Sequence, residues 1–143
     1  MPIVTNFDSV RSEVHAIAIE VLTFDDLRSH ICLTRTSHDA SHPELIDARK
    51  AEVALGRNDL ERVADLFRRE ARETPLGRTA FVVTSDVAFG LIRSLEQMLE
   101  GVCEVRPFRK QDKARAWLAA SGSAATIERQ PVAVRAQSSS GSR

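Results

Sequence analysis

The sequence predicts one α/β domain built around a small, mostly parallel sheet of about four to five strands with β-α repeats. The chain has 143 residues, of which 43% are hydrophobic and 28% are charged, and this composition suits one domain with a single core. Short apolar runs of strand length alternate with segments whose apolar residues recur at helical spacing. Because helices join parallel strands through right-handed crossovers, this alternation predicts a largely parallel sheet.

The first long strand is predicted over residues 15–21, where β-branched and apolar residues dominate. A short strand around residues 2–5 could pair with it in the antiparallel direction. Thr23 and Asp26 have the spacing of a capping box, in which side-chain oxygens accept hydrogen bonds from the first amides of a helix. They predict a helix that continues to about Thr34.

A polar loop is predicted over residues 36–43, which end in proline, and a short strand over residues 44–48 follows it. Asn58 and Glu61 supply the next capping signal, and Pro75 ends the helix that they begin. The apolar residues of this helix recur on one face, which should lie on the sheet. They are Leu60, Val63, Ala64, Phe67 and Ala71.

The third strand is predicted over residues 79–84, a continuous apolar run typical of a strand near the middle of the core. Asp86 is predicted to cap the following helix, which Gly101 ends. A fourth strand over residues 104–108 leads to a last short helix. One face of that helix carries Ala114, Trp117 and Leu118.

The domain is predicted to span residues 1–120, with a flexible tail over residues 121–143. The tail is rich in Ser, Ala, Gly, Gln and Arg and has no repeated apolar face. The N-terminus lacks a basic segment followed by an apolar core, and no run approaches the ~18 apolar residues of a membrane span. These patterns predict a cytoplasmic protein without a membrane span.

Charge and cysteine content exclude several kinds of partner and site. The 20 basic and 20 acidic side chains cancel, so no long-range field attracts a nucleic acid, and none is predicted as a partner. Cys32 and Cys103 lie far apart and neither has a neighbouring thiol, which excludes zinc-ribbon and disulfide-scaffold designs. Both are predicted to be small buried apolar residues.

Three segments together resemble one known family. They are the short second strand over residues 45–49, the strand, turn and helix start over residues 81–93, and the closing strand over residues 105–108 followed by the helix over residues 114–118. In this order they resemble the STAS-like (SpoIIAA-like) domain family, which is related in fold to Sec14-type lipid-binding domains. The resemblance spans residues 14–119 and implies helices packed mainly on one side of the sheet.

The resemblance also implies a regulatory role, with one departure. The better-understood STAS relatives are anti-sigma-factor antagonists, switched by phosphorylation of a Ser or Thr just before the second helix. A phosphate there places about two negative charges on a docking surface. In this chain no hydroxyl residue occurs between Ala48 and Asn58. The resemblance therefore implies a protein-interaction module that lacks this phosphorylation site.

Polar residues near the carboxyl ends of two predicted strands form the candidate binding site. Open α/β sheets place ligand crevices at this edge, and hydroxyls beside a helix N-terminus could hold an anion. A helix cap and turn is the alternative for Asp86, and an ion pair with Glu96 or Glu100 is the alternative for Arg93. The candidates for ligand or partner binding are Asp47, Arg49, Thr84, Ser85, Asp86 and Arg93.

Catalytic and metal-binding patterns are weak. His38, Asp39 and His42 share a loop, but they offer only three ligands and no fourth is indicated, so neither a metal nor a cofactor is predicted. The sequence has no nucleophile-elbow or phosphate-cradling glycine motif. Acid-base work by His15 or by the candidate carboxylates is the remaining enzymatic alternative, and the chain is predicted not to be an enzyme.

The sequence thus predicts a non-enzymatic STAS-like module whose partner is another protein or a second copy of itself as a homodimer. The alternative is a carrier of a small apolar ligand or lipid, held in a pocket between the helices and the sheet. These hypotheses differ in one structural respect. A core filled by side chains favours protein contacts, whereas an apolar pocket inside the domain favours cargo.

Overall fold

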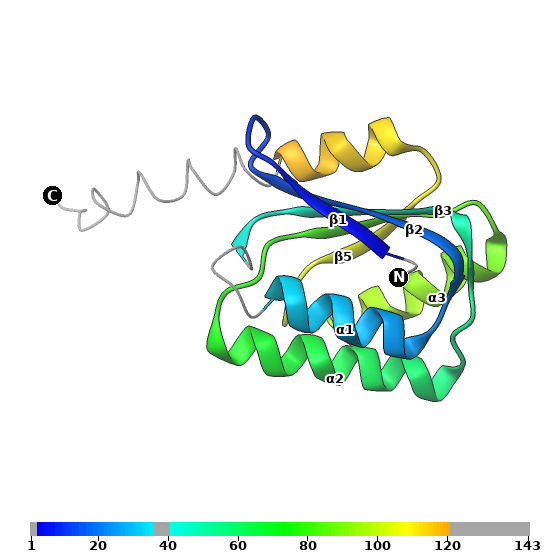
Figure 1. Cartoon of the computed structure of the whole chain (residues 1–143). Coiled ribbons are helices and arrows are strands. Elements are labelled where there is room, and N and C mark those ends of the chain that lie inside the picture. The colour runs from blue at the N-terminus through cyan, green and yellow to red at the C-terminus, as the bar shows by residue number, and fades with distance from the viewer. Residues whose placement is uncertain (1–2, 36–40, 121–143) are drawn as a thin grey trace, which may run out of the picture.

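The computed structural model describes residues 3–35 and 41–120, which form one five-stranded mixed sheet and four helices (Figure 1). The strands lie in sequence order across the sheet, and β1 is antiparallel to β2 while all other neighbours are parallel. This confirms the predicted fold class. The strands are β1 (Ile3–Asp8), β2 (Glu13–Leu22), β3 (Glu44–Val53), β4 (Thr79–Val82) and β5 (Val105–Phe108), and the helices are α1 (Phe24–Arg35), α2 (Arg57–Glu73), α3 (Asp86–Met98) and a last helix over residues 111–120.

Three helices cover one face of the sheet and the last helix covers part of the other (Figure 1). The face beneath α1, α2 and α3 holds the larger core, in which Ala16 and Ala18 of β2 and Phe81 of β4 meet the apolar residues of the helices. Alternate residues of a strand point to opposite faces, so a second core forms on the far side. There Ala114 and Leu118 of the last helix pack on Leu45, Ala80 and Val82.

Arginines attach the last helix to the sheet. The Arg78 guanidinium donates to the Trp117 carbonyl oxygen (3.0 Å) and lies 4.7 Å from the centre of the indole ring. Arg106 lies 4.9 Å from the same ring centre. Arg115 donates to the buried carboxylate of Glu13 at the start of β2 (2.7 Å). These contacts join the last helix to the starts of β2 and β4 and to β5.

Capping was predicted correctly at one helix and incorrectly at the next. At α1 the Thr23 N–H donates to Asp26 Oδ2 (3.0 Å) and the Asp26 N–H donates to Thr23 Oγ1 (3.3 Å), which confirms the capping box. At α2 the N-cap is Gly56 rather than Asn58, and Asp59 accepts a hydrogen bond from the Gly56 N–H (2.9 Å). Leu55 is buried immediately before this cap, and its place in the core sets the earlier start.

Two further expectations were wrong. β3 extends to Val53 instead of ending at Ala48, because it pairs with β2 along its whole length, through a register shift between Ile17 and Ile19. Cys32 is exposed and Cys103 is only partly buried, so neither is the buried apolar residue predicted. No helix in the described part of the chain is long and apolar enough to cross a membrane. The predicted tail over residues 121–143 lies outside the described residues.

Candidate functional site

A small cleft of about 330 Å³ opens at the carboxyl edge of the sheet. It forms where β3 continues beyond the end of β4 and the chain turns through residues 83–85 into α3. Small apolar side chains make most of its wall, and two hydroxyls and one carboxylate complete it. The lining residues are Ala48, Ala51, Glu52, Val53, Thr84, Ser85, Val87 and Ala88.

The first turn of α3 fixes one wall of this cleft. Ser85 is the N-cap, and its Oγ accepts a hydrogen bond from the Ala88 N–H (3.0 Å). The prediction that Asp86 caps this helix was therefore wrong. Asp86 instead accepts a hydrogen bond from Arg109 (2.6 Å), which also donates to the Thr84 carbonyl oxygen (3.2 Å). Since carboxylates suit the positive end of the helix dipole, Asp86 also stabilises this first turn.

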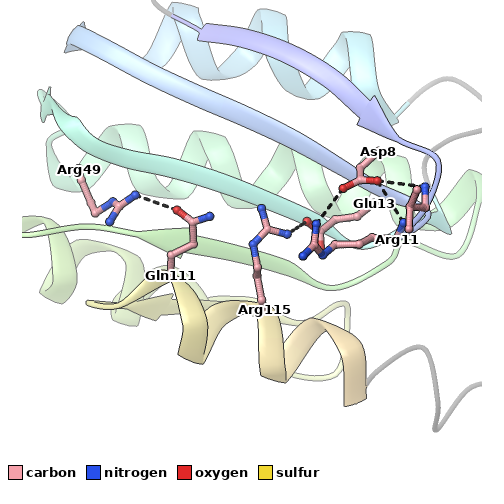
Figure 2. Close-up of polar contacts among 7 residues, drawn as sticks. Asp8, Arg11, Glu13, Arg49, Gln111 and Arg115 are labelled. Atoms are coloured by element: carbon pink, nitrogen blue, oxygen red, sulfur yellow. Dashed lines mark hydrogen bonds and ion pairs between the residues drawn. The ribbon is translucent and has the colours of Figure 1, made fainter.

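Asp47 and Arg49 lie on the other face of the sheet, the face of Leu45, although β3 does pair with β4. Figure 2 shows the Arg49 side chain pointing toward Gln111 of the last helix. Two hydrogen bonds join the Arg49 guanidinium to the Asp47 carboxylate, at 2.9 and 2.7 Å. Arg49 also donates to Gln111 Oε1 (2.8 Å), at the start of the last helix. Asp47 shares its face with Leu45, which packs under that helix, whereas Ala48 faces the cleft.

The bidentate contact determines the electrostatics of this pair. Hydrogen bonding to Arg49 lowers the pKa of Asp47 below its ordinary value of 3.8, against the opposing effect of partial burial, and the charges of Arg49 and His15 lower it further. The pKa of Arg49 is raised by the same contact. The two residues thus form an ion pair within β3, and the hydrogen bond from Arg49 to Gln111 links this pair to the last helix.

We expect the substitution Asp47→Asn to lower the free energy of unfolding by about 1 kcal/mol at pH 7. A depressed carboxyl pKa contributes stability above the pKa of the unfolded chain, and this contribution is lost as the pH falls through the folded pKa. The difference between wild type and Asp47→Asn should therefore shrink below about pH 4. Urea unfolding at pH 7 and pH 3 measures it. The control is Asp25→Asn, which removes an exposed contact of 3.7 Å with Arg28; an equal and pH-independent loss in both variants would contradict the prediction.

Arg93 lies apart from the other candidates, beside a larger cavity of about 440 Å³ at the β5 side of the sheet. Its guanidinium lies 3.5 Å from the Glu96 carboxylate, so the ion pair considered from the sequence is present. Glu96 also contacts Arg106 (3.3 Å), and both arginines line the cavity together with Trp117. Both arginines are already paired with the Glu96 carboxylate. We therefore interpret this cavity as a surface hollow beside the last helix, lined by these ion pairs, rather than as a binding site.

The structure therefore separates the six predicted residues into three places. Thr84 and Ser85 line the cleft with Asp86 beside them, Asp47 and Arg49 lie on the opposite sheet face, and Arg93 lies at the larger cavity. Sequence reasoning missed Arg109 and Gln111. Their partners lie 23 and 62 residues away along the chain, and no local pattern marks such contacts. The alternating order of β3 side chains could have placed Asp47 on the face away from Ala48.

The polar groups that line the cleft are two hydroxyls and one carboxylate. The described residues that line it include no histidine, cysteine or lysine. Within residues 3–35 and 41–120, no group of three or more His, Cys, Asp or Glu residues could hold a metal ion. His38 and Asp39 of the predicted loop lie outside the described residues.

Comparison with known proteins identifies the fold. No family model matches the sequence, and no curated protein matches it. The structure resembles that of an uncharacterized protein from the DUF3478 family, with a SpoIIAA-like fold, from Shewanella loihica PV-4. The TM-score is 0.54 and the sequence identity is 17%, with 81% of this chain and 93% of that chain covered. This confirms the resemblance seen in the sequence at the level of the fold, while the relation to Sec14-type domains stays a prediction. The chain has a SpoIIAA-like fold.

Proposed function

We propose that the protein is a non-enzymatic, STAS-like interaction module that binds a partner protein at the cleft on the carboxyl edge of its sheet. The observation that carries this proposal is the small, mostly apolar cleft, which opens beside a Val87 side chain that is 72% exposed. Exposed apolar side chains around a concave site are typical of protein-binding surfaces.

The lining defines the chemistry of the partner. Ala48, Ala51 and Ala88 leave room for one apolar side chain, which serves as an anchor in the cleft. Glu52 adds a carboxylate to the rim, so a lysine or arginine next to the anchor complements it. Thr84 and Ser85 lie at the opposite side and offer oxygen atoms to donors of the partner's main chain. The partner is therefore a protein segment with an apolar residue beside a basic one.

The connection between β3 and α2 bears on how this binding is controlled. It reads Val53-Ala54-Leu55-Gly56-Arg57, with Leu55 buried against the core. A phosphate requires a hydroxyl residue, and none occurs in this segment. Binding at the neighbouring cleft is therefore independent of phosphorylation at the position used by the better-understood STAS relatives.

A small apolar ligand is the alternative occupant. The space between the sheet and helices α1 to α3 contains a continuous cluster of buried side chains, and both cavities described above lie at its margins. This filled core supports protein contacts over a lipid enclosed within the domain. The cleft itself is at the lower end of the size range of about 300–1,000 Å³ typical of small-molecule sites. Native mass spectrometry of freshly purified protein distinguishes the two, because a carrier retains an added mass.

Partner binding should be lost in Val87→Glu and retained in Val102→Glu. Val87 lines the cleft, whereas Val102, which is also exposed, lies beyond the other end of α3. A glutamate at position 87 places a second carboxylate beside Glu52 and opposes an apolar anchor. The measurement is quantitative mass spectrometry of proteins cross-linked to wild type and to each variant in cells. A partner set that is the same for wild type and Val87→Glu would overturn the proposal.

A further inference from the structure

The two outer strands of the sheet differ in how they are protected. β5 is four residues long, contains Pro107 and is followed by Arg109, features that prevent pairing with another strand. β1 is six residues long, and it contains no proline and no charged residue from Ile3 to Phe7. Its first charged residue is Asp8, whose carboxylate forms an ion pair with the Arg11 guanidinium (3.1 Å). β1 therefore presents an uncharged edge that is able to pair.

Exposed apolar side chains flank this edge on both faces of the sheet. Val4 and Phe7 of β1 are 58% and 44% exposed, and Ile17, the cross-strand neighbour of Val4, is 39% exposed. Leu33 of α1 is 68% exposed. It lies one turn from His30, whose ring contacts Thr5 of β1, so it belongs to the flank of α1 nearest this strand. Figure 1 shows β1 at the outer side of the sheet with α1 beneath it.

We propose that β1 pairs in the antiparallel direction with β1 of a second copy, around a two-fold axis at Thr5, so that two sheets join as one. In this register Ile3 lies opposite Phe7 of the other copy, and Val4 lies opposite Asn6. Residues of the same face meet, because Ile3, Thr5 and Phe7 alternate with Val4 and Asn6. A two-fold interface must be self-complementary, and this strand brings no like charges together.

Two features favour a second copy over a different partner. They are the self-complementary pairing of β1 and the exposed flank of α1 beside it. The same axis brings the two α1 helices toward each other and places both Leu33 side chains at the junction beneath the joined sheet. The surface is thus continuous from the edge of β1 to α1. The inference goes beyond the proposed function and does not rest on it, because the cleft lies at the ends of β3 and β4 and stays open in the dimer.

The test compares two double variants of the full chain by size-exclusion chromatography with light scattering. Wild type should have twice the mass of one chain. Val4→Glu/Asn6→Glu puts two carboxylates opposite each other at both ends of the proposed register, so it should be monomeric. Val4→Lys/Asn6→Glu puts a lysine opposite a glutamate at the same two places, so it should remain dimeric. Both positions are exposed, and far-UV circular dichroism checks that each variant is folded.

Each alternative result overturns the proposed interface. A wild-type protein with the mass of one chain at all concentrations excludes the dimer. A dimeric Val4→Glu/Asn6→Glu variant places the contact on a different surface. A monomeric Val4→Lys/Asn6→Glu variant excludes this register. Loss of cross-linked partners in Val87→Glu reports separately on the cleft, so failure of one proposal is distinguishable from failure of the other.

Discussion

The substitution His30→Leu is expected to lower the free energy of unfolding by about 3–5 kcal/mol, because it removes one member of a buried polar pair. His30 Nε2 contacts Glu44 Oε2, and both side chains are almost completely buried. The His30 Nδ1 atom is also 3.3 Å from Thr5 Oγ1. The imidazole therefore links α1 to β1 and to the start of β3. A carboxylate that loses one of its hydrogen-bond partners inside a protein keeps the cost of leaving water with less to offset it.

A double variant separates the pair from its individual members. Replacing a buried polar pair by apolar residues of similar volume is often close to neutral, so His30→Leu/Glu44→Leu should be more stable than His30→Leu alone. Urea unfolding at one fixed protein concentration gives the four free energies of the cycle. If His30→Leu costs less than about 1 kcal/mol, or if the two losses simply add, the pair does not stabilise the fold in this way.

The elements that sequence reasoning placed well are those whose signal lies within a few residues. Thr23 and Asp26 are three residues apart, and the side chain of each accepts a hydrogen bond from the backbone N–H of the other at the start of α1. Both partners of this contact are therefore visible in the local sequence. The apolar run after Thr79 is another such case, since each residue of β4 is buried. The end of β3 was missed because Arg49 and Lys50 are charged. Both are tolerated in the strand because their side chains are exposed to water at this end of β3.

The candidate site was only partly predictable for a related reason. The sequence indicates which strands end near one another, and Thr84 and Ser85 do lie at the carboxyl edge. It does not indicate that Arg109 holds Asp86 or that Gln111 holds Arg49, since each contact depends on the packing of a distant element. The alternation of β3 does carry information, because it assigns Asp47 to the face of Leu45 and Ala48 to the face of the cleft.

Ending the chain after Lys110 is expected to abolish cooperative folding. The last helix, over residues 111–120, buries Leu118 against Leu45 and Val82, all three of which are almost inaccessible to water. Exposing one such side chain to water removes about 1.5–3 kcal/mol of the free energy that stabilises the fold. Because a domain of this kind is stable by only about 5–15 kcal/mol, loss of the helix removes most of that margin.

Ending the chain after Ala120 supplies the matched comparison. This shorter chain keeps every contact of Leu118, together with the hydrogen bonds from Arg78 to Trp117 and from Arg115 to Glu13. It should unfold at the same temperature as the full chain, because the domain is predicted to end there. Thermal unfolding followed by circular dichroism measures both truncations at one concentration. If the chain that ends after Lys110 still unfolds cooperatively near the full-chain temperature, the second core does not stabilise the fold. If the chain that ends after Ala120 loses several degrees, residues 121–143 belong to the domain.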